Sequence, residues 1–338
     1  MKKKVLAFAA LASVSGVAMA QSSVTAFGIV DLAARSLKGD DTLKLLNNEG
    51  RAASRLGFRG VEDLGGGMKA SFWIEHGLNA DDGSFGGNFW QRRATVSLSG
   101  GFGEVRLGRH KYSNRLVLDD FDPFSTSGMA DVSRVFTSLG LIAAPSARNF
   151  SGTFINRGNN QIGYHLPAMG GVYGSVDLNA GEGVNADKAI TGRLGYKSGP
   201  MHFAVGYGQH GATGKLKNMI IGGSYDIGGV LLMGSYTENK RGSAKQKVAT
   251  LAAVATMGSH KFTGSYAKAG GLATAKADLL AVGYDYSLSK RTSVYGTLAR
   301  TNNKEATRFT LNGAKEAALL SANGRDSSGY EFGIRHNF

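Results

Sequence analysis

Alternation of apolar and polar side chains constrains the fold of this chain more than any other feature. In residues 328–338, four apolar side chains all lie at even positions: Tyr330, Phe332, Ile334 and Phe338. A period of two sorts side chains onto the two faces of a β-strand, whereas a helix would scatter them around its circumference. The same pattern recurs at 280–288, 190–196 and 172–178. The sequence therefore predicts an all-β protein.

Sixteen segments can be placed as strands from this alternation and from the turns between them. They are 22–36, 51–63, 67–78, 88–100, 103–110, 157–166, 171–181, 188–198, 201–210, 216–227, 230–240, 245–257, 260–268, 275–287, 291–302 and 328–338. Alternation is ambiguous in the first, eleventh and fifteenth segments, which rest on turn spacing. A tilted strand crosses a bilayer in about 9 to 11 residues, and an even strand number suits a closed antiparallel barrel. We therefore predict a 16-stranded antiparallel transmembrane β-barrel.

Composition agrees with this fold class. The mean hydropathy is only −0.14, and no segment has the 18 consecutive apolar residues of a membrane-spanning helix. A barrel accounts for the low hydropathy because only every second side chain of a strand faces lipid. The chain has 50 glycines but only 4 prolines, which separates it from disordered Pro/Gly-rich sequences. It has no cysteine, so disulfides do not stabilise it.

Residues 1–20 have the features of a secretory signal peptide. Three lysines follow Met1, an apolar run starts at Val5, and Ala-Met-Ala at 18–20 forms a small-residue cleavage site. We expect export, cleavage after Ala20 and a single barrel domain over 21–338.

The connections between the expected strands alternate in length. Short turns such as Gly199-Pro200 are expected in the periplasm, and longer polar stretches such as 37–50 and 303–327 outside the cell. The connection at 111–156 runs 46 positions without a strand of its own. A loop of that length in a compact barrel is usually functional.

Several segments carry distinctive sequences. They are SSVTAFGIVD at 22–31, SRLGFRGVEDLGGG at 54–67, RRATVSL at 92–98, FGEVRLGR at 102–109, RGNNQIGY at 157–164 and GIRHNF at 333–338. Together they resemble the general porins of Gram-negative bacteria, in particular the branch found in beta-proteobacteria. The matching segments are dense over both termini and the first six expected strands.

The resemblance implies a homotrimer of barrels in which the third long loop, 111–156, folds inward to form a constriction. It also implies that the outer-membrane insertion machinery reads Phe338 as an assembly signal. Anion-selective members of the family line the constriction with arginines from the barrel wall. The positions that match them here are Arg55, Arg92, Arg93 and Arg157.

Alternation supports part of this set independently. In the second expected strand, Leu56 and Phe58 take the lipid face, which places Arg55 and Arg59 in the lumen. The same reasoning places Arg157 in the lumen.

In the fourth expected strand, two neighbouring arginines, Arg92 and Arg93, compete as the one that faces the lumen. Strict alternation favours Arg93, whereas the resemblance favours Arg92, so both remain candidates. Across the channel, we expect the loop acids Asp119, Asp120 and Asp122 to oppose the arginines and to hold the loop in place.

These features predict a water-filled outer-membrane channel for passive diffusion of small hydrophilic solutes. The formal net charge is +14, so we expect a preference for anions such as inorganic phosphate, chloride and small organic acids. We interpret most basic residues as solvated loop charge or as contacts for lipopolysaccharide. Nucleic acid is not an expected partner.

Other function classes fit less well. A substrate-specific channel is the nearest alternative and would need a fitted pocket in the lumen. A barrel enzyme would need a Ser-His or Asp-His pair at the outer rim, and a β-sandwich adhesin would not need sixteen bilayer-length strands. The seven histidines lack metal-ligand spacing, and no G-x-S-x-G motif occurs. We therefore predict no catalytic residue, metal or cofactor.

Overall fold

The computed structural model describes residues 23–133, 156–183, 188–211, 215–272, 275–305, 307–311, 320 and 322–338. The expected signal peptide and residues 134–155 of the long loop lie outside this set. Within the described residues, no helix is long and apolar enough to cross a membrane.

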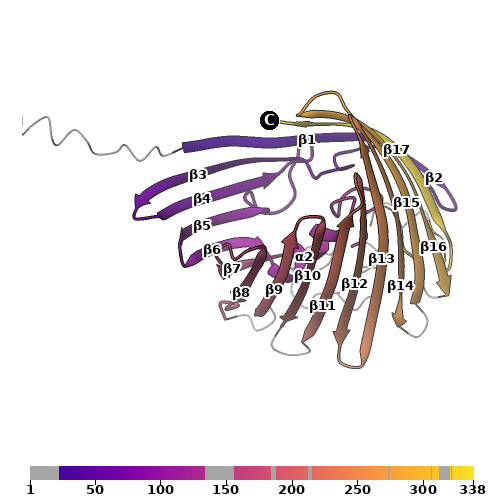
Figure 1. Cartoon of the computed structure of the whole chain (residues 1–338). Helices are drawn as coiled ribbons and strands as arrows, with labels where there is room; N and C mark the ends of the chain where they lie inside the picture. The colour runs from indigo at the N-terminus through magenta and orange to yellow at the C-terminus, as the bar shows by residue number, and fades with distance from the viewer. Residues whose placement is uncertain are drawn as a thin grey trace, which may run out of the picture.

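A single antiparallel sheet forms the wall (Figure 1). Its strands are β1 (Ser23–Lys38), β2 (Thr42–Asn47), β3 (Arg55–Gly65), β4 (Met68–Gly77), β5 (Arg93–Gly100), β6 (Gly103–Lys111), β7 (Arg157–His165), β8 (Val172–Asn179), β9 (Ala189–Ser198), β10 (Met201–His210), β11 (Leu216–Asp226), β12 (Val230–Arg241), β13 (Ala244–Met257), β14 (His260–Leu272), β15 (Ala275–Ser287), β16 (Thr292–Glu305) and β17 (Ser327–Asn337). The sheet closes because β1 pairs with β17 from Ile29↔Asn337 to Lys38↔Ser328.

The seventeen strands occupy sixteen positions around the barrel. One half of β1 pairs with β3 and the other half with β2, so β2 and β3 share the second position. The predicted 16-stranded antiparallel barrel is therefore confirmed.

The prediction of a loop at 37–50 is wrong. The chain turns back at once after β1 and continues as the wall strand β2, and residues 48–54 then leave the wall before β3 begins. Asp31 holds this excursion, because its Oδ2 accepts hydrogen bonds from the backbone N–H groups of Arg51 (2.9 Å) and Ala52 (2.8 Å). These hydrogen bonds join residues 20 positions or more apart in the chain, so the alternation of neighbouring residues could not predict them.

Two other boundaries differ from the predictions. The expected strand 88–100 begins only at Arg93, since residues 88–92 form turns. The expected loop 303–327 is shorter, because β16 continues to Glu305. The connections after β4, β6 and β16 are long and lie at one end of the barrel, called the long-loop end below. The opposite end, with turns such as 227–229, is called the short-turn end.

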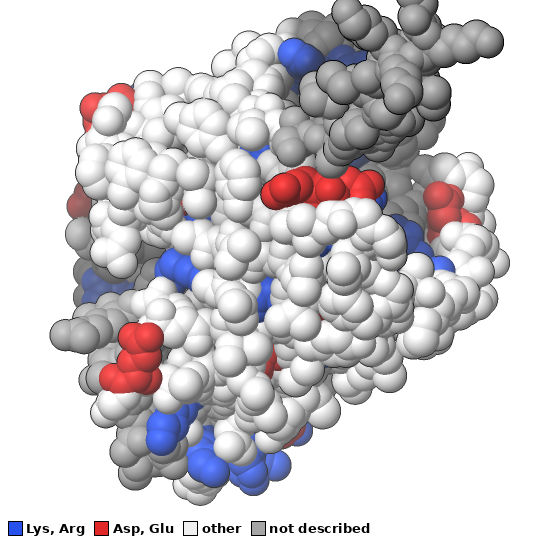
Figure 2. Space-filling view, turned by 90° about the vertical axis from the view of Figure 1, so that its left-hand side faces the viewer, with Lys and Arg blue, Asp and Glu red and all other residues white. Residues whose placement is uncertain are grey.

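The wall is apolar outside and polar inside. Along β10, the exposed side chains are Met201, Phe203, Val205 and Tyr207, while the intervening positions are more enclosed. Inward positions elsewhere bury polar groups such as Gln161, Asn218 and Asn239. Figure 2 shows one side of the molecule, where uncharged side chains cover most of the surface and charged groups form small separate patches. A soluble protein has the opposite arrangement, with polar side chains outside and apolar ones inside. A barrel whose outer face lies in lipid requires the arrangement seen here.

The long loop begins with the helix α2 (Ser113–Phe121), which packs against the inner faces of β9, β10 and β11 (Figure 1). Glycines in the wall make room for it: a Cβ at Gly222 would overlap the ring of Phe121, and one at Gly206 would lie 2.9 Å from Asn114 Cα. The loop was predicted without a strand, and the described part has none. The helix itself was not predicted.

Candidate pore constriction

A cavity of about 420 Å³ lies inside the barrel between the long loop and the wall. Its lining residues are Glu49, Ala53, Arg55, Arg92, Lys111, Arg115, Asp119, Ser125, Thr126, Ser127, Asp131, Ser133, Asn156 and Arg157. Five of these side chains are basic and three are acidic. The cavity therefore carries an excess of positive charge.

Two of the arginines share one carboxylate. Arg55, at the start of β3, has its Nη1 3.6 Å from Glu75 Oε1. Arg92, just before β5, donates from Nε to the same oxygen, and its backbone N–H donates to the Glu75 carbonyl at 3.2 Å. Glu75 thus orients both side chains and neutralises only part of their charge.

Arg157 is the third arginine that lines the cavity, together with Arg55 and Arg92, and these three are called the arginine cluster below. It begins β7, where it lies opposite Lys111 of β6. Its Nε is buried and has no hydrogen-bond partner among the described residues. Its guanidinium adds to the positive charge of the wall around the cavity.

The loop contributes an acid that is tied to two basic side chains. Asp119 of α2 accepts from Lys111 Nζ at 2.5 Å and from Arg115 Nε at 3.0 Å. Thr126 Oγ1 donates to the same carboxylate at 3.0 Å. Burial acts to raise the pKa of Asp119, but the two cations outweigh it and lower the pKa below its ordinary value. Asp119 is therefore an ionised group that fixes α2 near the arginines.

The other two loop acids lie elsewhere. Asp120 faces Arg193 of β9, with 3.3 Å between Oδ2 and Nη1. Asp122 is buried at the end of α2, where it accepts the backbone N–H groups of Phe124 (2.9 Å) and Thr126 (3.2 Å). Asp122 was expected to face the pore, but its carboxylate shapes the turn after the helix.

Arg93 and Arg59 form a second inward group around Trp73. The Arg93 guanidinium carbon lies 4.4 Å from the Trp73 ring centroid, and that of Arg59 lies 5.3 Å from it and 5.4 Å from the Phe27 ring. Alternation and resemblance each pointed to a different arginine, and both Arg92 and Arg93 are inside the barrel. Arg92 lines the cavity, whereas Arg93 lies in the Trp73 group.

Sequence reasoning missed five charged residues of the site: Glu75, which contacts two arginines, and the lining residues Glu49, Lys111, Arg115 and Asp131. The i, i+4 spacing of Arg115 and Asp119 is a helical ion-pair signal that was available. Glu75 lies two positions after Trp73 in β4, so both side chains point inward. That Glu75 lies beside Arg55 follows only from the register in which β3 and β4 pair.

A hydrogen bond at Ser113 and a cation–π contact at Phe124 hold the described part of the loop inside the barrel. Asp177 of β8 accepts from the backbone N–H of Ser113 at 2.6 Å, and His110 Nε2 lies 3.0 Å from its other oxygen. Farther along, Arg51 pairs with Asp285 at 2.9 Å and lies 5.0 Å from the Phe124 ring centroid. The loop therefore holds its position from both sides of the lumen.

Comparisons with known proteins agree with this architecture. The family model for Gram-negative porins matches residues 7–306. Outer membrane porin protein 32 of Delftia acidovorans is 37% identical over a 365-residue alignment that covers 100% of both chains. An outer membrane porin protein of Bordetella pertussis is 28% identical over 72% of this chain and 70% of its own.

Solved structures show the same likeness. The anion-selective porin from Comamonas acidovorans superposes with a TM-score of 0.83 at 34% identity, covering 94% of this chain and 100% of that one. OmpT of Vibrio cholerae, solved in a trimer form, gives a TM-score of 0.63 at 14% identity and covers 94% and 99%, so it shows the fold alone. The chain belongs to the Gram-negative porins, channel proteins of the outer membrane that are not enzymes.

Proposed function

We propose that this porin is a passive diffusion channel that prefers small anions, including inorganic phosphate, chloride and small organic acids. The observation that carries the proposal is the inward cluster of Arg55, Arg92 and Arg157, which faces a cavity with more basic than acidic side chains. The Comamonas acidovorans structure, described as an anion-selective porin, supports the same preference.

Arginine is suited to this role because a guanidinium stays charged at physiological pH and presents planar donors to carboxylate and phosphate oxygens. Arg55, Arg92 and Arg157 all line the cavity and can present such donors to it. At physiological salt the Debye length is about 8 Å, comparable to the width of a porin constriction, so the preference is graded rather than absolute. It should weaken in molar salt.

The proposal includes the biogenesis and assembly of the channel. The signal peptide 1–20 is removed after Ala20, the long-loop end faces the cell exterior, and the barrels form a homotrimer. The insertion machinery recognises Phe338, whose backbone pairs with Gly28 through hydrogen bonds of 3.0 and 3.1 Å. Lipopolysaccharide surrounds the exterior end.

The zero-current potential across a planar bilayer that holds the purified protein in a tenfold KCl gradient tests this proposal. We expect the sign of the potential to report chloride as the more permeant ion. A potential of the opposite sign would show that the acids of the loop control the pore, and an absence of conductance would contradict the channel itself.

A further inference from the structure

The excursion at residues 48–54 forms a small hairpin inside the barrel. Glu49 and Ala53 form an antiparallel bridge across it, and both residues line the cavity beside the arginine cluster. The wall strand β1 holds the hairpin, because Arg35 Nη2 donates to the Glu49 carbonyl oxygen at 2.7 Å and Asp31 accepts two of its backbone N–H groups. Two inward segments, the long loop and the excursion, therefore border the cavity together with the wall.

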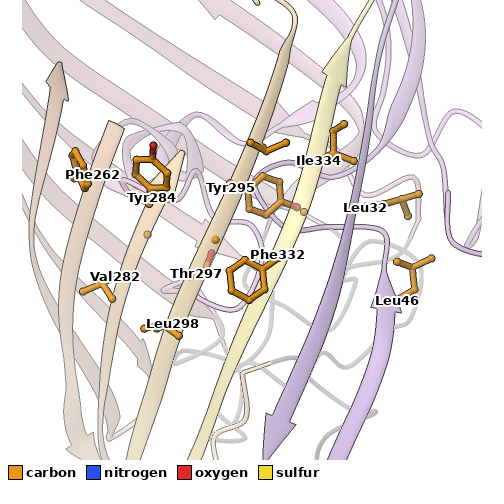
Figure 3. Close-up of a pocket in the computed structure, with 14 residues that line it drawn as sticks. Leu32, Leu46, Phe262, Val282, Tyr284, Tyr295, Thr297, Leu298, Phe332 and Ile334 are labelled. Carbon is orange, nitrogen blue, oxygen red and sulfur yellow. The ribbon is translucent and has the colours of Figure 1, made fainter. Parts of the chain in front are cut away.

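The wall beneath the excursion is hollowed at glycine positions. Tyr295 of β16 is buried, whereas Phe332 of β17, in the same view, lies on the outer face and is exposed (Figure 3). A Cβ at Gly333 of β17 or at Gly50 of the excursion would overlap the Tyr295 hydroxyl, which donates to Asp31. Tyr295 therefore fills the space between the wall and the excursion, and it fits there because both neighbours lack a side chain.

Arg51 of the excursion contacts the wall and the long loop at once. Its guanidinium carbon lies 5.0 Å from the Phe124 ring centroid on the loop and 5.1 Å from the Tyr295 ring centroid on the wall. Its Nε donates to Asp285 Oδ1 at 2.9 Å, and its Nη2 donates to the Gly296 carbonyl oxygen at 3.1 Å. The guanidinium thus joins an aromatic ring of the loop to an aromatic ring of the wall.

Two more glycines bring the loop close to this support. A Cβ at Gly283 of β15 would overlap Arg51 Nη2 and would lie 2.9 Å from Phe124 Cε1. Gly128 of the loop has a φ of 69°, and a Cβ there would overlap the Gly50 carbonyl oxygen. The loop after α2 therefore lies against the excursion, backbone to backbone.

We infer that the excursion is a second constriction element that carries the long loop after α2, and that Arg51 is the positioning residue that keeps this part of the loop in place during conduction. A cation stacked on aromatic rings is held more tightly where water is excluded, and Arg51 is only 6% exposed. Loops that make few buried contacts open locally at a low free-energy cost. A loop segment released from Arg51 would move into the lumen and briefly reduce the current, whichever ion carries it.

Single-channel recordings of the purified porin in a planar bilayer test this role through the rate of brief partial closures. Phe124→Leu removes the ring on the loop but leaves every charge in place. Arg51→Met/Asp285→Asn removes the ion pair without leaving a buried charge. The matched control, Arg106→Met/Glu104→Gln, removes another ion pair of the wall, which joins its charged atoms at 2.9 Å near the short-turn end of β6. Gel mobility after heating gives the denaturation temperature of each sample.

We expect the rate of partial closures to rise about tenfold in Phe124→Leu and in Arg51→Met/Asp285→Asn, and to stay at the wild-type value in the control. A lower denaturation temperature with unchanged closures would show a role in barrel stability alone and would overturn the inference. Equal closure rates in all three variants would overturn it too. Phe124→Leu keeps the buried charges paired, so it decides the question even where the double variant folds poorly.

Discussion

Glu75 sets how much of the arginine charge acts on ions in the lumen. Its carboxylate contacts both Arg55 and Arg92, and it is only 7% exposed. The negative charge of Glu75 therefore offsets part of the positive charge of Arg55 and Arg92, so the three residues set the local charge of the constriction together.

Replacement of Glu75 by Gln should raise the permeability of anions relative to cations, because two guanidiniums lose their shared counter-charge. The zero-current potential in a KCl gradient measures this ratio. Glu62→Gln, an exposed acid near the short-turn end of β3, serves as the control and should leave the ratio unchanged. A lower anion preference in Glu75→Gln would mean that Glu75 mainly holds the arginines in place.

Acidification should strengthen the anion preference between pH 8 and pH 5. Burial and the nearby charge of Asp131 raise the pKa of Asp122 to about 7, and burial raises the pKa of Asp120. A carboxyl group with a raised pKa takes up its proton earlier as the pH falls, so the loop loses negative charge while Asp119, whose pKa is lowered, stays ionised. The zero-current potential, recorded at each pH, reports the change.

The double variant Asp120→Asn/Asp122→Asn should make that pH dependence flatter. Asp63→Asn, at the short-turn end of β3, should keep the wild-type dependence. A wild-type potential that does not change over this range would contradict the expectation that these two acids take up protons between pH 8 and pH 5 and that their charge acts on the lumen.

Helix α2 depends on glycine in the wall opposite it. The buried face of the helix includes Val117, Leu118 and Phe121, and Gly222 lies under the Phe121 ring. Any side chain at 222 must push the helix toward the lumen.

Gly222→Val should therefore reduce the single-channel conductance, because the displaced helix narrows the pore. Gly223→Val is a close control: it lies one position along the same strand, where a Cβ would meet its nearest atoms at 3.6 and 3.7 Å. Its conductance should equal that of the wild type. Equal reductions in both variants would point to damage to β11 rather than to movement of α2.

Alternation predicted the strands well because the lipid outside and the polar lumen inside act on every residue of the wall. The strands from β7 to β17 fall close to their predicted ranges for this reason. The excursion at 48–54 and helix α2 were missed because long-range contacts of Asp31 and Gly222 fix them. The arginines Arg55 and Arg157 could be placed inside from parity, but their partners Glu75 and Lys111 required the register of neighbouring strands.

Closure of the barrel joins residues that are far apart in the chain. Across the seam between β1 and β17, Arg35 pairs with Glu331 at 2.6 Å, and both side chains are fully enclosed. Removal of one partner of a buried ion pair typically costs about 3–5 kcal/mol, because the remaining charge stays buried without compensation.

Glu331→Ala should therefore lower the temperature at which the folded barrel converts to the heat-denatured form, as seen by its gel mobility. The double variant Arg35→Met/Glu331→Met should recover most of the loss, since it leaves no buried charge. Arg300→Ala, which breaks the exposed pair with Asp326, should cost less than about 1 kcal/mol. An unchanged denaturation temperature in Glu331→Ala would show that the seam does not limit stability.

Zero-current potentials of the wild type and of Arg55→Ser/Arg157→Ser, recorded in the same KCl gradient, test most directly whether the arginine cluster selects the ions. Arg291→Ser/Arg325→Ser removes the same charge from exposed positions and serves as the control. The chloride preference should fall to a permeability ratio of about 1 in Arg55→Ser/Arg157→Ser and persist in Arg291→Ser/Arg325→Ser. An undiminished preference in Arg55→Ser/Arg157→Ser would contradict the claim that the arginine cluster selects the ions.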